Sequence, residues 1–379
     1  MSTYAKDFGP FNDHVWLNAS AHGPLPRMAV EAAREAISWH ISPHLLTEDR
    51  FRETPLRLKR NLSRLIGAPA EDIILGNSTS YGLHLLANGI PWKKGDEVLC
   101  VKGDFPASVL PWLGLRKRGV VVREIKPAGP KLTSRDVETN LSKATKLLCA
   151  TWVDSFTGHA LDLKAIGDVC RANRTWFVLN GTQAIGARSL DVSATPVDAV
   201  SCCGYKWLCG PYATGFCWMV PELLNSLEYN QAYWLTMHGD RDLNKMRDYQ
   251  IRTDAGAATY DVFCQANLLN FVPWTASVDY LLSQGIAQIQ KHNDRLVEGL
   301  IKGLDAKNFA VLSPIEPKDR TAIVIISHRH ADRNPALFEV LKRERIDISL
   351  REGNLRFSPH LYNTPVEIDY AVSMLNRLR

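Results

Sequence analysis

Lys206 is the residue whose surroundings most strongly suggest chemistry. It lies in the segment SCCGYKWLCGPYATG, between Tyr205 and Trp207, with Gly204 and Gly210 on either side. Burial disfavours the ammonium form, which lowers the pKa of a lysine and leaves an amine that can attack a carbonyl. Most lysines instead lie at the surface with the ammonium group in water. Local sequence features do not decide between these two interpretations.

A second polar segment, VLNGTQAIGA, precedes this lysine. The segment predicts a buried strand that ends at Asn180, followed by a tight turn at Gly181. Gln183 is then placed to hydrogen-bond a group above the end of the strand. An anionic residue is expected where Asn180 stands, so the surroundings indicate a cofactor site that has lost a charge.

Small hydroxyl residues also begin a predicted helix in GNSTSYGLHLLANGI. Ser78, Thr79 and Ser80 come at its start, where free backbone N–H groups and the helix dipole favour a phosphate. Ordinary helix capping by serine or threonine is the alternative. The chain lacks the GxxxxGK[ST] loop, and no GxGxxG follows a predicted strand, which argues against nucleotide binding.

The elements that must position these residues follow an α/β pattern. Residues 28–66 have apolar positions at helical spacing, with Gly67 as a stop. Between residues 73 and 220, short apolar runs alternate with helical stretches, which predicts βαβ units and a mostly parallel sheet: EVLCV, VVVREI, KLLCATWV, TWFVLN, AVSCCG and GFCWMV. A long amphipathic stretch follows over 266–300, and the tail predicts a smaller α+β domain.

These patterns predict three parts of the chain. Residues 1–26 form an N-terminal segment, 27–270 a large α/β domain and 271–379 a small α+β domain. A chain of 379 residues is long enough for two such domains.

Composition narrows the class of protein. The net charge is +5, and basic residues are scattered among acidic ones, so nucleic acid is not an expected partner. Apolar runs are too short to cross a membrane, and the N-terminus lacks a signal-peptide core, so we expect a soluble, cytoplasmic protein. The eight cysteines show no CxxC pairing and are expected to be reduced and buried. His328 and His330 have no third ligand nearby in sequence, so no metal is expected.

The order and spacing of these segments resemble one family. The chain is similar to class V, fold-type I pyridoxal-phosphate enzymes, nearest to isopenicillin-N-epimerase-like members and the cysteine desulfurases. The resemblance runs from HVWLNASAHGPLP at 14–26 through LRFSPHLYNTPVEID at 355–369. It implies a seven-stranded-type sheet in the large domain. It also implies that Lys206, which is 26 residues after Asn180, holds pyridoxal 5'-phosphate as an aldimine and moves the α-proton as general base.

The resemblance assigns further roles to single residues. Ser78 and Thr79 match the turn that binds the phosphate, and Phe105 matches the aromatic residue that stacks on the pyridine ring. Arg356 matches the arginine that clamps a substrate carboxylate. The cofactor's phenolic oxygen is contacted near Ser155 and Gln183, and the expected cofactor-binding set is completed by Asn180, Cys203, Tyr205 and Lys206.

Four departures from the family pattern qualify these roles. Asn180 replaces an aspartate, Cys203 replaces a common serine, and Ala257 stands where a phosphate-binding threonine often reaches across the dimer. The phosphate is therefore expected to bind less tightly than usual. No cysteine follows Cys264, so desulfuration through a mobile persulfide cysteine is excluded.

Asn180 affects the expected chemistry most. A carboxylate keeps the pyridine nitrogen protonated, whereas an amide can only donate an N–H to the unprotonated nitrogen and so gives a weaker electron sink. The expected function is an epimerase or lyase acting at the α-carbon or β-bond of a small amino-acid-like substrate with a carboxylate. The alternatives are a class V aminotransferase and a catalytically impaired cofactor-binding protein that acts as a sensor or scaffold. The resemblance also implies a homodimer.

Overall fold

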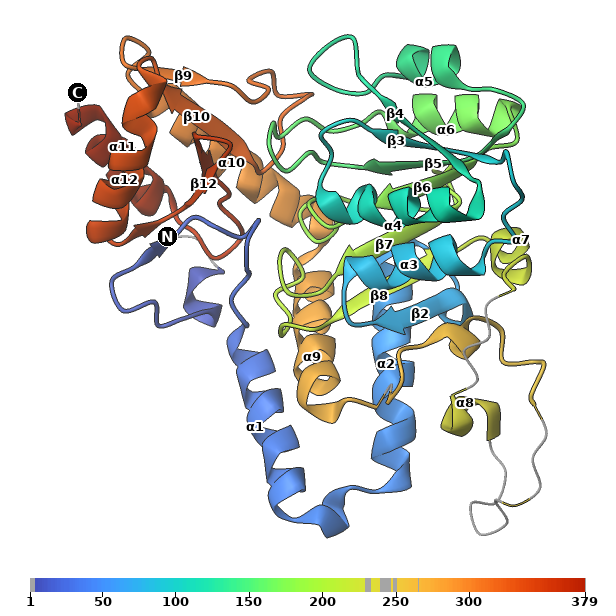
Figure 1. The fold of residues 1–379 in the computed structure, drawn as a ribbon. Coiled ribbons are helices and arrows are strands. Elements are labelled where there is room, and N and C mark those ends of the chain that lie inside the picture. Colours follow the sequence, from blue (N-terminus) through green and yellow to red (C-terminus); the bar gives the residue numbers. More distant parts are fainter. Residues whose placement is uncertain (1–3, 229–232, 239–246, 248–250, 265, 379) are drawn as a thin grey trace.

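The main element of the fold is a seven-stranded sheet (Figure 1). The computed structural model describes residues 4–228, 233–238, 247, 251–264 and 266–378. The strands lie in the order β2 (Ile73–Gly76), β8 (Gly215–Met219), β7 (Ala199–Cys203), β6 (Trp176–Asn180), β5 (Thr145–Thr151), β3 (Glu97–Val101) and β4 (Val121–Ile125). All adjacent pairs from β7 to β4 are parallel, whereas β8 is antiparallel to both of its neighbours. The predicted mostly parallel sheet is confirmed.

The strands form where the sequence has its short apolar runs. Each of the six predicted runs contains one strand, and every residue of β2, β7 and β8 is buried. Strands covered on both faces need near-continuous apolar sequence rather than alternation, which is why these runs were recognisable.

Helices cover the sheet and extend away from it (Figure 1). The hairpin of α1 (Arg27–Ile41) and α2 (Glu48–Ile66) packs against α9 (Leu268–Gln284). Helix α2 ends at Gly67, whose φ of 72° is left-handed, as the predicted stop requires. The remaining helices of this part are α3 (Thr79–Gly89), α4 (Leu110–Leu113), α5 (Ser134–Asn140), α6 (Leu163–Ala172), α7 (Pro221–Asn225) and α8 (Trp234–His238).

A four-stranded antiparallel sheet lies beside the large one (Figure 1). Its strands run in the order β12 (Ser349–Arg351), β13 (Asn354–Phe357), β10 (Val324–His328) and β9 (Phe309–Val311). The helices α10 (Ile286–Gly303), α11 (Asn334–Arg343) and α12 (Pro365–Arg377) belong to the same part. The N-terminal strand β1 (Val15–Trp16) pairs with β11 (Ile346–Asp347), so the N-terminal segment joins the small C-terminal part there.

Two expectations about this half of the chain concern α9: the long amphipathic stretch and the domain boundary. The amphipathic stretch over 266–300 is two helices, α9 and α10, separated at Gly285 with φ 80°. The predicted domain boundary after residue 270 falls inside α9, and the division into domains stays a prediction.

The cysteines differ in one respect from the expectation. All eight are free, and seven are buried, but Cys264 is exposed in the loop before α9. Among the described residues, no three His, Cys, Asp or Glu side chains gather as a set that could hold a metal.

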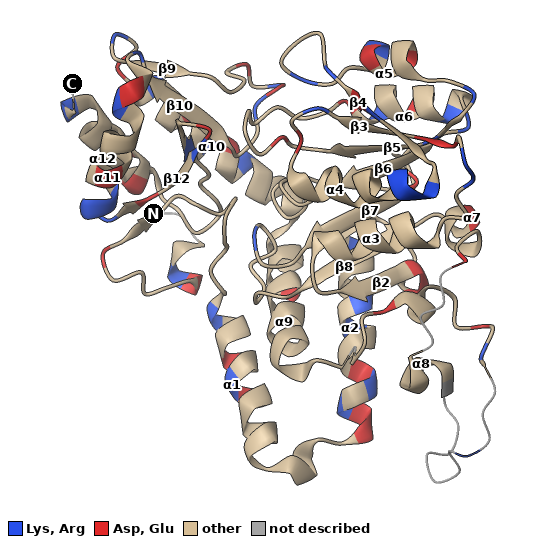
Figure 2. Ribbon diagram, viewed as in Figure 1, with Lys and Arg blue, Asp and Glu red and all other residues tan. Residues whose placement is uncertain are grey.

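Basic and acidic residues are not separated along the helical hairpin. Figure 2 shows basic and acidic residues mixed along α1 and α2. Within the described ranges, none of the helices has the length and apolar character needed to cross a membrane.

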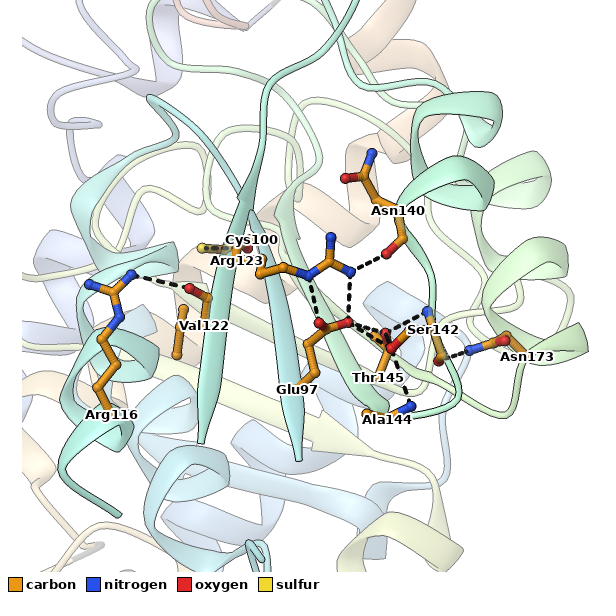
Figure 3. Close-up of polar contacts among 10 residues, drawn as sticks. All are labelled: Glu97, Cys100, Arg116, Val122, Arg123, Asn140, Ser142, Ala144, Thr145 and Asn173. Atoms are coloured by element: carbon orange, nitrogen blue, oxygen red, sulfur yellow. Dashed lines mark hydrogen bonds and ion pairs between the residues drawn. The ribbon is translucent and has the colours of Figure 1, made fainter. Parts of the chain in front are cut away.

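The amino end of the sheet carries a charged cluster (Figure 3). Arg123 on β4 donates from Nε and Nη2 to the two carboxylate oxygens of Glu97, at 2.5 and 2.8 Å. Ser142 and Thr145 donate hydroxyl hydrogens to the same carboxylate, and Arg123 also donates to the Asn140 carbonyl. Burial alone would raise the pKa of Glu97, but these hydrogen bonds and the Arg123 charge lower it. The cluster is a structural ion pair whose carboxylate is hydrogen-bonded within the protein.

Candidate active site

The turn after β7 holds Lys206 in a tightly packed position. Gly204 donates its N–H to the Thr214 carbonyl at 2.8 Å, which closes the turn. On its other side the N-terminal segment passes so closely that a Cβ on Gly23 would lie 2.0 Å from the Lys206 carbonyl oxygen. The lysine is therefore enclosed, with 9% of its surface exposed.

Enclosure changes the acidity of this lysine. Burial lowers the pKa of Lys206; the nearby Cys203 thiol opposes that shift, and the positive charge of Arg356 adds to it. No described carboxylate forms an ion pair with the amine, which lies 5.5 Å from the centre of the Phe105 ring. These are the surroundings that a nucleophilic lysine requires, and they differ from those of a solvated surface lysine.

The end of β6 places Asn180 at the base of the same site. The residue is buried, and its Oδ1 accepts the Thr182 N–H at 3.1 Å. Its Nδ2 donates to the Ser108 hydroxyl at 2.9 Å. One Nδ2 hydrogen remains for a ligand, because an amide nitrogen carries two.

Gln183 connects three parts of the chain. Its Nε2 donates to the Ser20 carbonyl at 3.0 Å and to the Ser155 hydroxyl at 2.9 Å. Its Oε1 accepts the Trp207 indole N–H at 2.8 Å. The structure thus brings Gln183 and Ser155 together beside the lysine turn.

Arg356 enters the site from the small sheet. One Nη donates to both the carbonyl and the hydroxyl of Ser155 at 3.2 Å, and the other donates to Ser349 at 3.3 Å. The side chain is 2% exposed, and its Nε has no hydrogen-bond partner. Burial lowers the pKa of Arg356 to about 10, with a further contribution from Arg351. A buried guanidinium with no carboxylate partner among the described residues is ready to receive an anionic ligand.

The N-terminus of α3 lies against the lysine turn. Ser78 caps this helix by accepting the Tyr81 N–H, so the capping interpretation of the serine holds. The Thr79 hydroxyl pairs with that of Thr182, and the Cys203 thiol lies near both hydroxyls. Gly215 of β8 approaches so closely that a Cβ there would lie 2.7 Å from the Ser78 nitrogen.

Two aromatic residues border the site. Phe105 is 39% exposed, and its ring stacks with Phe156 at a centroid distance of 6.4 Å. Tyr205 stacks with His22 at 5.9 Å, and burial raises the pKa of the tyrosine. Phe105 therefore offers an open ring face on the side of the lysine.

Ala257 takes a different position from the other predicted site residues. It lies in a 3-10 helix over Gly256–Tyr260, is buried, and packs into an apolar cluster with Leu83 and Leu227. Its methyl group therefore packs in the core of the chain.

Four hydroxyl-bearing residues of this region were not predicted. Ser20, Ser108, Thr151 and Thr182 are all buried and hydrogen-bonded to predicted residues or to one another. One signal could have found Thr151 and Thr182: they stand at or just after the carboxyl ends of parallel strands, where ligand sites form.

The residues fit the pyridoxal phosphate that the resemblance implies. An amine with a lowered pKa, a spare amide hydrogen at Asn180 and an unpartnered Nε at Arg356 all lie in a buried region. The amine would react with an aldehyde, the amide hydrogen would bond to a ring nitrogen, and the guanidinium would bind a carboxylate.

Comparison with known proteins agrees with this geometry. The family model described as Aminotransferase class-V matches residues 40–370. A probable cysteine desulfurase of Methanothermobacter thermautotrophicus is 27% identical over 96% of this chain and 94% of the relative. Isopenicillin N epimerase of Streptomyces clavuligerus is 25% identical, also over 96% and 94%. A structure of a C-DES mutant with glycine covalently linked to its PLP cofactor has a TM-score of 0.89 at 18% identity, covering 98% of both chains.

Proposed function

The chain belongs to the class-V aminotransferase family, and on that basis we propose that it is an epimerase or lyase acting on an amino acid. Enzymes of this family depend on pyridoxal phosphate, which supplies an electron sink for bonds at the substrate's α-carbon. The observation that carries the proposal is a buried Lys206 with a lowered pKa, close to a buried Arg356 that has no acidic partner among the described residues.

Different residues of the chain have different roles in the proposed reaction. Lys206 would hold the cofactor through Nζ, with release of water from the aldehyde, and its amine, once free, would move a proton at the substrate's α-carbon. Arg356 orients the substrate by its carboxylate, with Ser155 and Ser349 fixing the guanidinium plane. Phe105 would cover one face of the ring, and the start of α3 with Thr79 would bind the phosphate.

Asn180 limits how strongly this site can promote bond breaking. Its spare Nδ2 hydrogen would be available to the ring nitrogen, and an amide stabilises a protonated ring nitrogen less than a carboxylate does. We therefore expect slow proton removal and intact binding of the amino acid.

Two known relatives and one absent residue support an epimerase or lyase. One relative is named isopenicillin N epimerase, and a structure similar in fold is described as the cystine C-S lyase C-DES. The chain has no cysteine after Cys264, which argues against desulfuration through a persulfide on the protein. A class-V aminotransferase is the alternative within the same chemistry.

A second candidate is a cofactor-binding protein that no longer catalyses a reaction. Asn180, Cys203 and Ala257 favour it, because each replaces a residue that family members use to hold or tune the cofactor. Such a protein would keep the lysine and the arginine as a sensor or scaffold.

The first experiment tests the cofactor and its lysine. We expect the purified protein, incubated with pyridoxal phosphate, to absorb visible light and to lose that absorbance on borohydride reduction. The Lys206→Ala variant should be colourless after desalting, whereas Lys164→Ala, which changes an exposed lysine, should match the unchanged protein. A borohydride-reducible adduct that persists in Lys206→Ala would contradict the assignment of the lysine.

The second experiment separates the enzyme from the non-catalytic candidate. Exchange of the α-proton with deuterium is followed by NMR over a panel of amino acids, for the unchanged protein and for Asn180→Asp. We expect exchange in both, faster by about 10-fold or more in Asn180→Asp because the carboxylate restores the electron sink. Chirality and keto-acid assays on the best substrate then distinguish epimerase, lyase and aminotransferase. Absence of exchange in both proteins would exclude the enzyme.

We also propose a homodimer, as the family resemblance implies. Light scattering on the eluted protein checks the mass. The buried position of Ala257 leads us to expect no phosphate contact from its side chain across such a dimer.

A further inference from the structure

A chain of hydrogen bonds leads from Asn180 to a carboxylate. The Asn180 amide donates to the Ser108 hydroxyl, which lies 2.9 Å from the Thr151 hydroxyl. Thr151 donates in turn to Oδ1 of Asp104. Ser108 and Thr151 are both buried, and the chain links the ends of β6 and β5 to the loop after β3.

The hydrogens of this chain have only one consistent direction. The Thr182 N–H requires an acceptor, so Asn180 presents Oδ1 to it and Nδ2 to Ser108. A carboxylate only accepts, so the single hydroxyl hydrogen of Thr151 points to Asp104. Thr151 must then accept from Ser108, and Ser108 must accept from Asn180. Every member donates toward Asp104, which makes it the negative end of the chain.

Asp104 also connects directly to the residue that covers the ring. It precedes Phe105 in sequence, and its Oδ1 accepts the Phe105 N–H at 2.6 Å. Its Oδ2 accepts the Thr151 N–H at 3.0 Å. One carboxylate thus fixes the loop that carries Phe105 and the orientation of the amide below it.

We propose that Asp104 is a positioning residue for the ring nitrogen, acting on Asn180 through Thr151 and Ser108. The inference rests on the proposed function, since it requires the ring nitrogen to face Asn180. The ionised carboxylate holds the amide with one Nδ2 hydrogen free for the ring. Because every bond of the chain donates toward Asp104, electron density passes back to Nδ2, and the free N–H is a weaker donor that leaves the ring nitrogen more basic. A negative charge at the end of the chain favours positive charge on the bound cofactor.

The simpler interpretation is that the chain only satisfies buried hydroxyls. It predicts that removing one hydroxyl alters stability alone. The proposal predicts instead that removing a hydroxyl disconnects Asp104 and changes the electronic state of the cofactor, with the Asp104 charge still present.

The experiment measures the pH midpoint of the visible absorbance band of the cofactor-loaded protein. We expect Asp104→Asn to lower this midpoint by roughly one pH unit, because a charge that favours the protonated form is lost. Thr151→Val keeps the charge and should give more than half of that shift. In Asp104→Asn/Thr151→Val the shift should equal that of Asp104→Asn alone, since both changes break one chain.

Asp154 provides the matched control. Its carboxylate accepts the N–H groups of Phe156 and Thr157 and has no described bond to the chain of Asn180. Asp154→Asn should shift the midpoint by less than half as much as Asp104→Asn. Solid-state 15N NMR of cofactor labelled at the ring nitrogen should show a changed resonance in Thr151→Val and an unchanged one in Asp154→Asn.

The outcomes separate this inference from the function on which it rests. A protein that binds no cofactor gives no visible band and refutes both. A normal band whose midpoint and nitrogen resonance are unchanged in Thr151→Val overturns the role of Asp104 alone. Thermal unfolding of each variant verifies that the compared proteins are folded.

Discussion

The two ends of the large parallel sheet lie beside polar clusters of opposite character. At the amino end, Glu97 and Arg123 neutralise each other, and hydroxyl groups complete the bonds of the carboxylate (Figure 3). At the carboxyl end, Lys206 and Arg356 are buried without a described acidic partner. One end of the sheet therefore carries a paired acid and base, and the other carries basic groups without a described acidic partner.

This difference shows where the fold gives up stability for binding. A buried charge without a counter-ion costs free energy that a ligand can restore, so unpaired groups gather where a ligand is expected. The acids at the two ends differ accordingly. The pKa of Glu97 is lowered, while burial raises the pKa of Asp104 to about 6 despite its hydrogen bonds.

The largest expected effect comes from removing the unpaired arginine. We expect Arg356→Met to reduce kcat/KM for the best substrate by about 10³-fold, or about 4 kcal/mol, because the carboxylate clamp is lost. The unfolding free energy of the cofactor-free protein should stay equal or rise by up to about 1 kcal/mol, since a desolvated cation is removed. Exchange kinetics and urea denaturation measure the two effects.

Arg356→Lys serves as the control for this change. It keeps the charge and loses the two-pronged geometry, so we expect a loss of about 10²-fold. A fall in stability above about 2 kcal/mol in Arg356→Met would show that the arginine holds the fold together.

The corresponding change at the amino end should lower stability and leave the cofactor site unaffected. Arg123→Met leaves the Glu97 carboxylate without its ion pair and should lower the unfolding free energy by about 2 kcal/mol, less than for a fully buried pair because Arg123 is partly exposed. The visible band of the bound cofactor should not change. Urea denaturation and absorbance spectra measure these quantities.

A double variant checks that this loss arises from the pair. In Glu97→Gln/Arg123→Met no unpaired charge remains, so we expect more than half of the lost stability to return. A double variant as unstable as the sum of the single ones would assign the loss to packing.

The raised and lowered pKa values predict opposite responses to pH. Asp104 has a folded pKa of about 6, above its ordinary 3.8, so the unfolded chain releases its proton first and stability falls as pH rises from 3.8 to 6. Glu97 has a folded pKa below 4.5, so its contribution is present above that pH and is lost as pH falls through the folded value. The two carboxylates thus act on stability in different pH ranges and with opposite signs.

Denaturation curves between pH 3 and 7 test this contrast. Compared with the unchanged protein, Asp104→Asn should gain about 1–2 kcal/mol between pH 4 and 6, whereas Glu97→Gln should lose its disadvantage only as pH falls through the lowered pKa of Glu97. Other groups near Asp104 are unchanged in both variants: Cys100, Cys149 and Asp154. Parallel curves for Asp104→Asn and the unchanged protein would contradict the raised pKa.

Much of this contrast could be predicted from the sequence, and part could not. The apolar runs predicted the strands, because buried parallel strands need continuous apolar residues. Lys206 stood out because glycines and aromatic residues frame it, but its proposed role came from the order and spacing of the segments that resemble the family. The chain from Asn180 to Asp104 could not, because it joins residues separated by 72, 43 and 47 positions through side-chain orientations that sequence does not specify.

The smallest effects compare one substitution at both ends of β5. Thr145 begins this strand and donates to Glu97, whereas Thr151 ends it and donates to Asp104. Threonine to valine keeps the shape and removes the hydroxyl, so Thr145→Val should lower the unfolding free energy by about 1 kcal/mol and leave the cofactor band unchanged. Thr151→Val should cost no more, about 0.5–1 kcal/mol, and yet shift the band midpoint. If both variants altered only the unfolding free energy and left the band midpoint unchanged, neither end of β5 would act on the cofactor.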